Sequence, residues 1–214
     1  MNAQSQRSTI AGPSGALEVL VDTPSEADFP ALRGTAVIAH PHPLFGGTMD
    51  NKVVQTLARA FVLSGWRSVR FNFRGIGKSE GSYDEGRGEL QDMQATIAYF
   101  APEGALALAG FSFGSFVTSH AVQALGPART PEKLVLVGTA ATRFQVAPIP
   151  PELHSRTLVV HGEVDDTVPL ADVLNWARPQ ILPVTVIPGV EHFFHGQLPL
   201  LRSLVVRHLN APLV

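Results

Sequence analysis

One serine of this sequence stands in a setting that could make it a nucleophile. Ser112 is the centre of Gly110–Gly114 (GFSFG), a G-x-S-x-G pattern between the apolar run Leu106–Ala109 and a stretch of helical character. A serine on so tight a strand-to-helix turn brings the residues two positions before and after it close together, so only glycines fit there. Ser115 lacks such a flanking glycine pair. The pattern therefore predicts Ser112 as the nucleophile.

A serine hydroxyl is a weak nucleophile unless a base accepts its proton, so a histidine is required. His192 directly follows the apolar run Val184–Ile187 and its short turn, and His195 lies three residues further on. The position nearer the strand favours His192 as the base, and we assign no role to His195. We expect His161, which ends an apolar run, to pack or hydrogen-bond locally.

The base in turn needs a carboxylate that orients its ring and stabilises the imidazolium. Three acids, Glu163, Asp165 and Asp166, follow the apolar run Thr157–Val160 in the segment HGEVDDTVP. Adjacent acids in a loop are often a solvated turn or a helix cap, and Asp166 fits that interpretation. From the residues alone, Glu163 and Asp165 both remain candidates for the carboxylate that partners the base.

An acyl-transfer site also needs two N–H donors for the oxyanion that forms during the reaction. The N–H of Phe113, just after the nucleophile, is the first candidate. The second should come from the loop His40–Gly47 (HPHPLFGG), whose two prolines have no N–H and stiffen the loop. The choice is thereby narrowed to His42 or, less favoured, Leu44 or Phe45.

Short apolar runs alternate with helical stretches along the whole chain. This alternation predicts a doubly wound, mostly parallel α/β sheet with helices on both faces, in which ligands bind beyond the carboxyl ends of the strands. We expect a single domain over residues 1–214, with residues 1–12 as a flexible N-terminal segment. The expected strands are 16–21, 35–39, 68–73, 106–111, 133–137, 157–160 and 184–187, and the helices 50–63, 89–100, 114–125, 170–177 and 198–208. Asp50 is the expected N-cap of the first helix.

The composition excludes several classes of function. The 214 residues include no Cys, which removes disulfides, thiolate metal sites and Cys nucleophiles. A net charge of -2 gives no general attraction to nucleic acid or to anionic membranes. We find no signal peptide and no apolar run long enough to span a membrane, so we expect a cytoplasmic protein. The composition is compatible with a homo-oligomer.

Taken together, the motifs give a resemblance to a known family. The chain resembles the α/β-hydrolase superfamily over almost its full length, in particular small bacterial hydrolases with a His-Pro-His-Pro loop that are related to dienelactone hydrolases and carboxylesterases. The chain order of nucleophile, acid and base is also that of α/β-hydrolases. The segments that carry the resemblance are 40–52 (HPHPLFGGTMDNK), 70–81 (RFNFRGIGKSEG), 110–114 (GFSFG), 161–169 (HGEVDDTVP) and 191–196 (EHFFHG).

The resemblance implies roles for particular residues. Ser112, Asp165 and His192 occupy the triad positions, and His42 occupies the upstream oxyanion position. Asp165 is preferred to Asp166 because the family's acid falls four residues after the histidine of the His-Gly pair. The chain departs from the family pattern in two respects: His-Pro replaces the His-Gly of many members, and the Cys nucleophile of dienelactone hydrolases has no counterpart here.

The resulting hypothesis is a serine carboxylesterase that acts on small to medium acyl or aryl esters, without cofactor or metal. Leu44, Phe45 and Phe193 are the candidates for the pocket walls. Residues 138–156 leave no room for a large cap domain, so we expect an open cleft. Thioesters and small amides are alternative substrates.

Three rival interpretations are less well supported. The segment Ile76–Ser79 looks like the end of a phosphate-binding P-loop, but Asn72 stands where its first glycine should be. His40 and His42 could form a metal-binding pair, although no third ligand is evident. A non-catalytic binding protein with the same fold is the remaining alternative.

Overall fold

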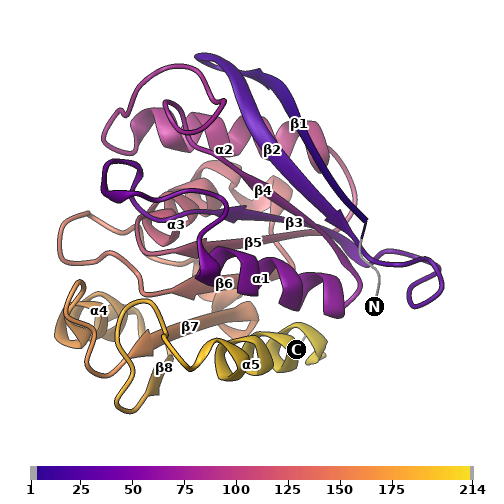
Figure 1. The fold of residues 1–214 in the computed structure, drawn as a ribbon. Coiled ribbons are helices and arrows are strands. Elements are labelled where there is room, and N and C mark those ends of the chain that lie inside the picture. The colour runs from indigo at the N-terminus through magenta and orange to yellow at the C-terminus, as the bar shows by residue number, and fades with distance from the viewer. Residues whose placement is uncertain (1–3, 213–214) are drawn as a thin grey trace.

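The protein is described here by a computed structural model, which covers residues 4–212. Eight strands form one sheet in the order β1-β2-β4-β3-β5-β6-β7-β8 (Figure 1). The pairs β1–β2 and β2–β4 are antiparallel, and all other neighbours are parallel. The strands are β1 (Gln4–Gly12), β2 (Gly15–Thr23), β3 (Gly34–Ala39), β4 (Trp66–Phe71), β5 (Leu106–Phe111), β6 (Lys133–Val137), β7 (Thr157–Gly162) and β8 (Val184–Ile187).

Helices cover both faces of the sheet, which confirms the predicted doubly wound α/β class (Figure 1). The central strands β5 and β6 are buried at every residue, as expected for strands with a helix layer on either side. Helices α1 and α5 pack on one face, and α2, α3 and α4 on the other. The helices are α1 (Lys52–Leu63), α2 (Arg87–Phe100), α3 (Phe113–Leu125), α4 (Leu170–Ala177) and α5 (Leu198–Asn210).

The prediction of a flexible segment over residues 1–12 is wrong for the part of it that the structure describes. Residues 4–12 form strand β1, which pairs with β2 along its whole length, from Gln4 opposite Thr23 to Gly12 opposite Gly15. Most β1 side chains are exposed, so the segment has no apolar periodicity from which a strand could be predicted. Residues 1–3 lie outside the described range.

The N-cap of helix α1 lies one residue later than predicted, and the helix begins at Lys52. Asn51, not Asp50, is the N-cap, and its side chain accepts hydrogen bonds from the N–H groups of Val53 and Val54 at 2.9 and 3.4 Å. The Asp50 carboxylate instead pairs with Arg7 of β1 at 2.7 Å. This start matters because α1 follows the loop that carries the predicted oxyanion donor.

The segment that resembled a P-loop binds a carboxylate of its own chain. The buried side chain of Glu18 on β2 accepts hydrogen bonds from Asn72 Nδ2 at 2.8 Å and from the Lys78 N–H at 2.9 Å. A side chain at Gly77 would overlap this carboxylate and the Asn72 amide. The glycine-rich loop therefore wraps an internal acid, which explains its composition without a bound nucleotide.

Between residues 4 and 212, no helix combines the length and the apolar character that crossing a membrane requires.

Candidate active site

Ser112 lies on a strained turn between β5 and α3. Its backbone has φ 56° and ψ -118°, in the left-handed region that non-glycine residues rarely adopt. Its N–H donates to the Val137 carbonyl at 2.8 Å, which ties the turn to the neighbouring strand β6. A Cβ at Gly110 would overlap the Gly114 carbonyl, and a Cβ at Gly114 would overlap the Ala39 carbonyl. Both glycines are therefore required by space, as the motif predicted.

His192 reaches Ser112 from the loop after β8. Its Nε2 lies 3.0 Å from Ser112 Oγ, and its ring packs at 4.9 Å from that of Phe111. The side chain is buried, so its rotamer is fixed by packing as well as by hydrogen bonds. His195 is not brought to this site: it is exposed and its Nδ1 lies 3.0 Å from Glu191 Oε1.

Asp165 completes a hydrogen-bonded chain behind His192. Its Oδ2 lies 2.6 Å from His192 Nδ1, while Oδ1 accepts from the N–H groups of Thr167 at 3.0 Å and Val168 at 2.7 Å. Burial opposes ionisation of this carboxyl, but the bond to His192, the charge of that histidine and the Val168 N–H together hold the pKa of Asp165 below its usual value. Asp165 is therefore ionised at neutral pH and fixes the tautomer of His192.

The two other candidate acids, Glu163 and Asp166, do not take part in the hydrogen bonds that link Ser112, His192 and Asp165. Asp166 Oδ1 accepts from the hydroxyl of Thr167 at 3.3 Å in an exposed turn. Glu163 accepts from the N–H of Gly189 at 2.9 Å and thereby ties together the loops after β7 and β8. Of the three acids after β7, Asp165 alone contacts His192.

His161 is a second histidine beside Asp165, at 3.4 Å between its Nε2 and Asp165 Oδ2. Its Nε2–H donates to the Val168 carbonyl at 2.8 Å, which is the local bond that its position predicted. Burial lowers the pKa of His161, so the ring is neutral and does not compete with His192 for the negative charge.

The loop after β3 narrows the choice of the second oxyanion donor. The Leu44 N–H donates to His42 Nδ1 at 3.2 Å, and the Phe45 N–H donates to the His42 carbonyl at 3.1 Å. Both alternative donors are thus used within the loop. Within residues 4–212, the N–H groups of His42 and Phe113 have no hydrogen-bond partner, and both residues line a cavity that Ser112 also lines.

The two histidines of this loop are held by protein groups. The buried ring of His40 donates from Nδ1 to the Pro41 carbonyl at 2.6 Å and accepts from the Phe73 N–H at 3.0 Å. Burial lowers the pKa of His40 to about 3 and keeps the ring neutral. His42 Nε2 lies 3.2 Å from the hydroxyl of Tyr83. Neither ring is directed at a shared third ligand, and the described residues contain no group of three or more His, Asp or Glu arranged to hold a metal.

Ser112 opens into a cleft of about 360 Å³, which continues into a narrow apolar recess of about 50 Å³. Phe45 lines both, and Phe193 lines the larger part. The prediction for Leu44 is wrong: its side chain is 65% exposed and lines neither space, because the short 3-10 turn at residues 43–45 directs it outward.

Several residues that line the cleft, and one that contacts His42, were not predicted from the sequence. Arg143 and Phe144 come from the loop after β6, which carries no motif. Thr167 lies two residues after Asp165, in the loop after β7. Asn51 was hidden by its neighbour Asp50, although Asn is an equally good N-cap residue. Tyr83 was hidden in the glycine-rich loop, where nothing indicated that it would reach His42.

Comparison with known proteins decides the family. An α/β serine hydrolase without lid from Xanthomonas campestris is 35% identical, with a TM-score of 0.85 over 98% of this chain and 95% of that one. The chain belongs to the α/β serine hydrolases of the α/β-hydrolase superfamily. A second member, an α/β serine hydrolase homologue from Coxiella burnetii, is 37% identical with a TM-score of 0.78, over 95% of this hydrolase and 97% of its relative.

Comparison with curated protein sequences gives a match over a shorter part of the chain. An uncharacterized protein from Rickettsia prowazekii is 35% identical over 115 residues, which are 52% of this hydrolase and 47% of its relative. The match thus spans about half the length of that curated relative. No family model matches the sequence. The link to dienelactone hydrolases stays a resemblance.

Proposed function

We propose that this serine hydrolase cleaves carboxylic esters of small to medium acyl or aryl substrates through an acyl-enzyme. The observation that carries the proposal is the continuous chain from Ser112 Oγ to His192 Nε2 at 3.0 Å and from His192 Nδ1 to Asp165 Oδ2 at 2.6 Å. Nucleophile, base and orienting acid in this arrangement are the requirement for nucleophilic catalysis by serine. A purely binding protein would have no need of it.

In the proposed mechanism, Ser112 Oγ attacks the ester carbonyl carbon while His192 Nε2 accepts its proton. The N–H groups of Phe113 and His42 stabilise the oxyanion of the tetrahedral intermediate. When the intermediate collapses, His192 donates the proton to the departing alkoxide, which leaves as the alcohol. Asp165 stabilises the imidazolium throughout and stays ionised.

Deacylation follows the same route with water as the nucleophile. His192 accepts a proton from a water molecule, whose oxygen attacks the acyl carbon of the ester on Ser112. The second tetrahedral intermediate uses the same N–H donors, and His192 returns the proton to Ser112 Oγ as the acid is released. We expect water to reach the cleft, because the described chain between β6 and β7 forms a short 3-10 helix at Pro151–Arg156 and no cap domain.

The dimensions of the cleft favour short or aromatic acyl groups. A narrow recess of about 50 Å³ between Phe113, Phe144 and Val168 suits a few methylene groups or the edge of a ring. The wider part of about 360 Å³ would hold the alcohol portion near Phe193. A long fatty acyl chain would extend past these walls into solvent and gain little from burial.

The proposal is tested by hydrolysis of p-nitrophenyl esters of increasing acyl length and of matched aryl esters, thioesters and anilides. We expect kcat/KM to be highest for acetyl to hexanoyl or for aryl esters, and to fall for longer chains. A higher kcat/KM for the thioester or the anilide would mean that the same site acts on one of these alternative substrates. No turnover of any of them would contradict the proposal.

A further inference from the structure

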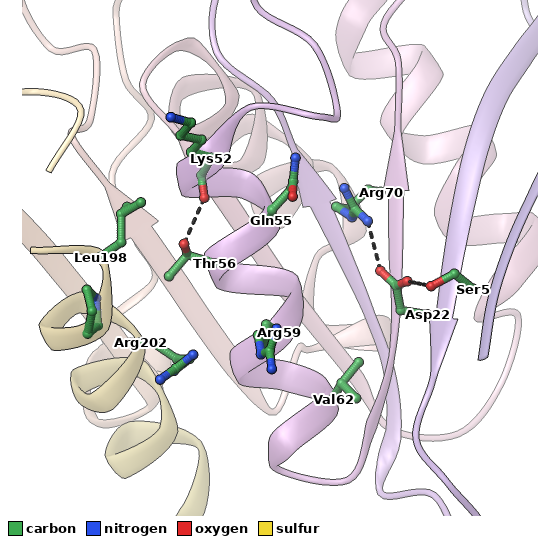
Figure 2. A pocket seen from close by; sticks show the side chains of 11 residues that line it. Ser5, Asp22, Lys52, Gln55, Thr56, Arg59, Val62, Arg70, Leu198 and Arg202 are labelled. Atoms are coloured by element: carbon green, nitrogen blue, oxygen red, sulfur yellow. Dashed lines mark hydrogen bonds and ion pairs between the residues drawn. The ribbon is translucent and has the colours of Figure 1, made fainter. Parts of the chain in front are cut away.

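A second, larger cavity lies away from the cleft, over the outward face of α1. It has a volume of about 540 Å³ and none of the residues that line it lines the cleft at Ser112. Helix α1 runs along it, with α5 on one side and strands β2 and β4 on the other (Figure 2). We call this cavity the basic trough, because its charged lining residues are Lys52, Arg59, Arg70, Arg202 and Asp22.

Three of the four cationic side chains form no ion pair with a described carboxylate. Lys52 and Arg59 of α1 and Arg202 of α5 form no ion pair within residues 4–212. Figure 2 shows Arg202 directed from α5 toward α1, where Arg59 lies. On a protein with a net charge of -2, such a local excess of positive charge is not a property of the surface as a whole. The trough attracts anions, while the protein as a whole does not.

The fourth cation, Arg70, is buried and only partly satisfied. Its residue exposure is 7%, and its two terminal nitrogens bind Asp22 Oδ2 at 3.0 Å and the Met49 carbonyl at 2.9 Å. Its Nε has no hydrogen-bond partner. A buried donor is seldom left unpaired unless a ligand or a water molecule completes it. Asp50 also lies 3.5 Å from this guanidinium, but its carboxylate is shared with Arg7.

The carboxylate in the trough does not neutralise it. Asp22 is engaged on both sides, by Arg70 at 3.0 Å and by the hydroxyl of Ser5 at 2.5 Å. The dashed contacts in Figure 2 follow this chain from Arg70 through Asp22 to Ser5. Asp22 therefore orients Arg70 and leaves Lys52 and Arg59 without a counter-charge.

We propose that the basic trough binds a phosphorylated small molecule that carries at least two negative charges. Guanidinium groups match phosphate oxygens in pairs, and cations on two helices can hold two phosphoryl groups at once. The volume is in the range of small-molecule sites. Val62 and Leu198 add apolar walls for an organic portion of the ligand. The site is separate from ester hydrolysis and does not depend on it.

The test is isothermal titration of the full-length protein with inorganic pyrophosphate at low ionic strength, with orthophosphate and sulfate for comparison. We expect saturable one-to-one binding that is at least tenfold tighter for pyrophosphate than for sulfate. The double substitution Arg59→Gln with Arg202→Gln should weaken pyrophosphate binding at least tenfold. Arg59 is exposed, Arg202 is half-buried, and neither forms an ion pair, so folding should be preserved and turnover of an ester should not change.

A matched control removes the same charge elsewhere. Arg178→Gln with Arg207→Gln leaves the trough intact, because neither residue lines it, and should leave pyrophosphate binding within twofold of wild type. Arg70→Lys, which keeps a cation beside Asp22 but removes the Nε donor, should weaken binding several-fold. Absence of saturable binding to the wild type, or equal weakening by the trough and control pairs, would overturn the proposal.

Discussion

Two clusters of buried polar side chains flank the same edge of the sheet, and they differ in what they leave unsatisfied. In the first, Ser112, His192 and Asp165 form a single chain whose free end, Ser112 Oγ, opens into a cleft. In the second, Arg74 and Asp92 are bound to each other by several hydrogen bonds of 2.8–3.2 Å, and Asp92 also accepts from the Arg74 N–H.

The difference shows how a catalytic cluster can be distinguished from one that only stabilises the fold. Both clusters are buried, so burial of polar groups does not by itself mark a functional site. The Arg74–Asp92 pair has no free end and holds the loop after β4 against α2. The chain at Ser112 ends at a hydroxyl beside two unpaired N–H groups, those of His42 and Phe113. Breaking the first cluster should remove activity, and breaking the second should remove stability.

The largest expected effect comes from Ser112→Ala. Loss of the nucleophile should lower kcat for a short p-nitrophenyl ester by about a million-fold, as complete loss of a serine triad does. The free energy of unfolding should change by less than about 1 kcal/mol, because alanine has the same Cβ at this φ and loses only one hydrogen bond. Steady-state kinetics and urea denaturation of the same preparation check both parts. A large loss of stability would place Ser112 among the supporting residues.

Asp165→Asn should come next, with kcat reduced about 10⁴-fold because the amide leaves His192 without its counter-charge and favours the wrong tautomer. Asp166→Asn is the matched control, and its kcat should stay within about twofold of wild type. The comparison uses one ester under one set of conditions. Equal loss in the two variants would contradict the assignment of Asp165 as the orienting acid.

For the supporting cluster, Asp92→Asn should lower the free energy of unfolding by about 3–5 kcal/mol, because it leaves the buried Arg74 guanidinium without a carboxylate. Asp84→Asn removes the partner of Arg87 in an exposed ion pair and should leave the free energy of unfolding nearly unchanged. Urea denaturation measures both. A small effect of Asp92→Asn would mean that the loop after β4 does not depend on this pair.

A smaller effect distinguishes the supporting His40 from His192. The pKa of His40 is about 3 in the folded protein, against an ordinary value of 6.5. As the pH falls below 6.5, His40 binds a proton in the unfolded chain but not in the folded protein. The free energy of unfolding therefore keeps its full His40 contribution above pH 6.5 and loses it progressively toward pH 3. The slope due to His40 should approach about 1.4 kcal/mol per pH unit.

His40→Gln is the variant that isolates this slope, because glutamine retains a donor and an acceptor for Pro41 and Phe73. Its free energy of unfolding should be lower at pH 7 but should fall less steeply between pH 6.5 and 4.5 than that of wild type. Urea denaturation at each pH gives the two curves. Parallel curves would show that His40 does not carry the pH dependence.

Much of the fold was predictable because its strands are short, apolar and bounded by clear turns. The sequence predicted β5, β6 and β8 at their observed bounds. For β5 and β6 the reason is that burial on both faces leaves an almost continuous apolar run, whereas β8 is a half-buried edge strand. Strand β1 was missed because an exposed edge strand depends on backbone pairing, which has no side-chain signature. The same limit hid the basic trough, whose cations are far apart in sequence.

The candidate site was predictable to the extent that each residue directly follows a strand. Ser112, Asp165 and His192 lie within hydrogen-bonding distance as expected, because the parallel strands bring their carboxyl ends to one edge. Their catalytic roles stay predictions until activity is measured. Arg143 and Tyr83 were missed because they lie in loops without a motif, and only the fold brings Arg143 to the cleft and Tyr83 to the ring of His42.

Reaction with a fluorophosphonate, followed by peptide mass spectrometry, tests the central claim most directly. This reagent modifies a serine only where a base and an oxyanion site activate it. We predict one adduct per molecule, on Ser112, that forms quickly in wild type and Asp166→Asn and at least a hundredfold more slowly in His192→Ala. An unmodified protein, an adduct on Ser115, or equal rates in wild type and His192→Ala would contradict the account.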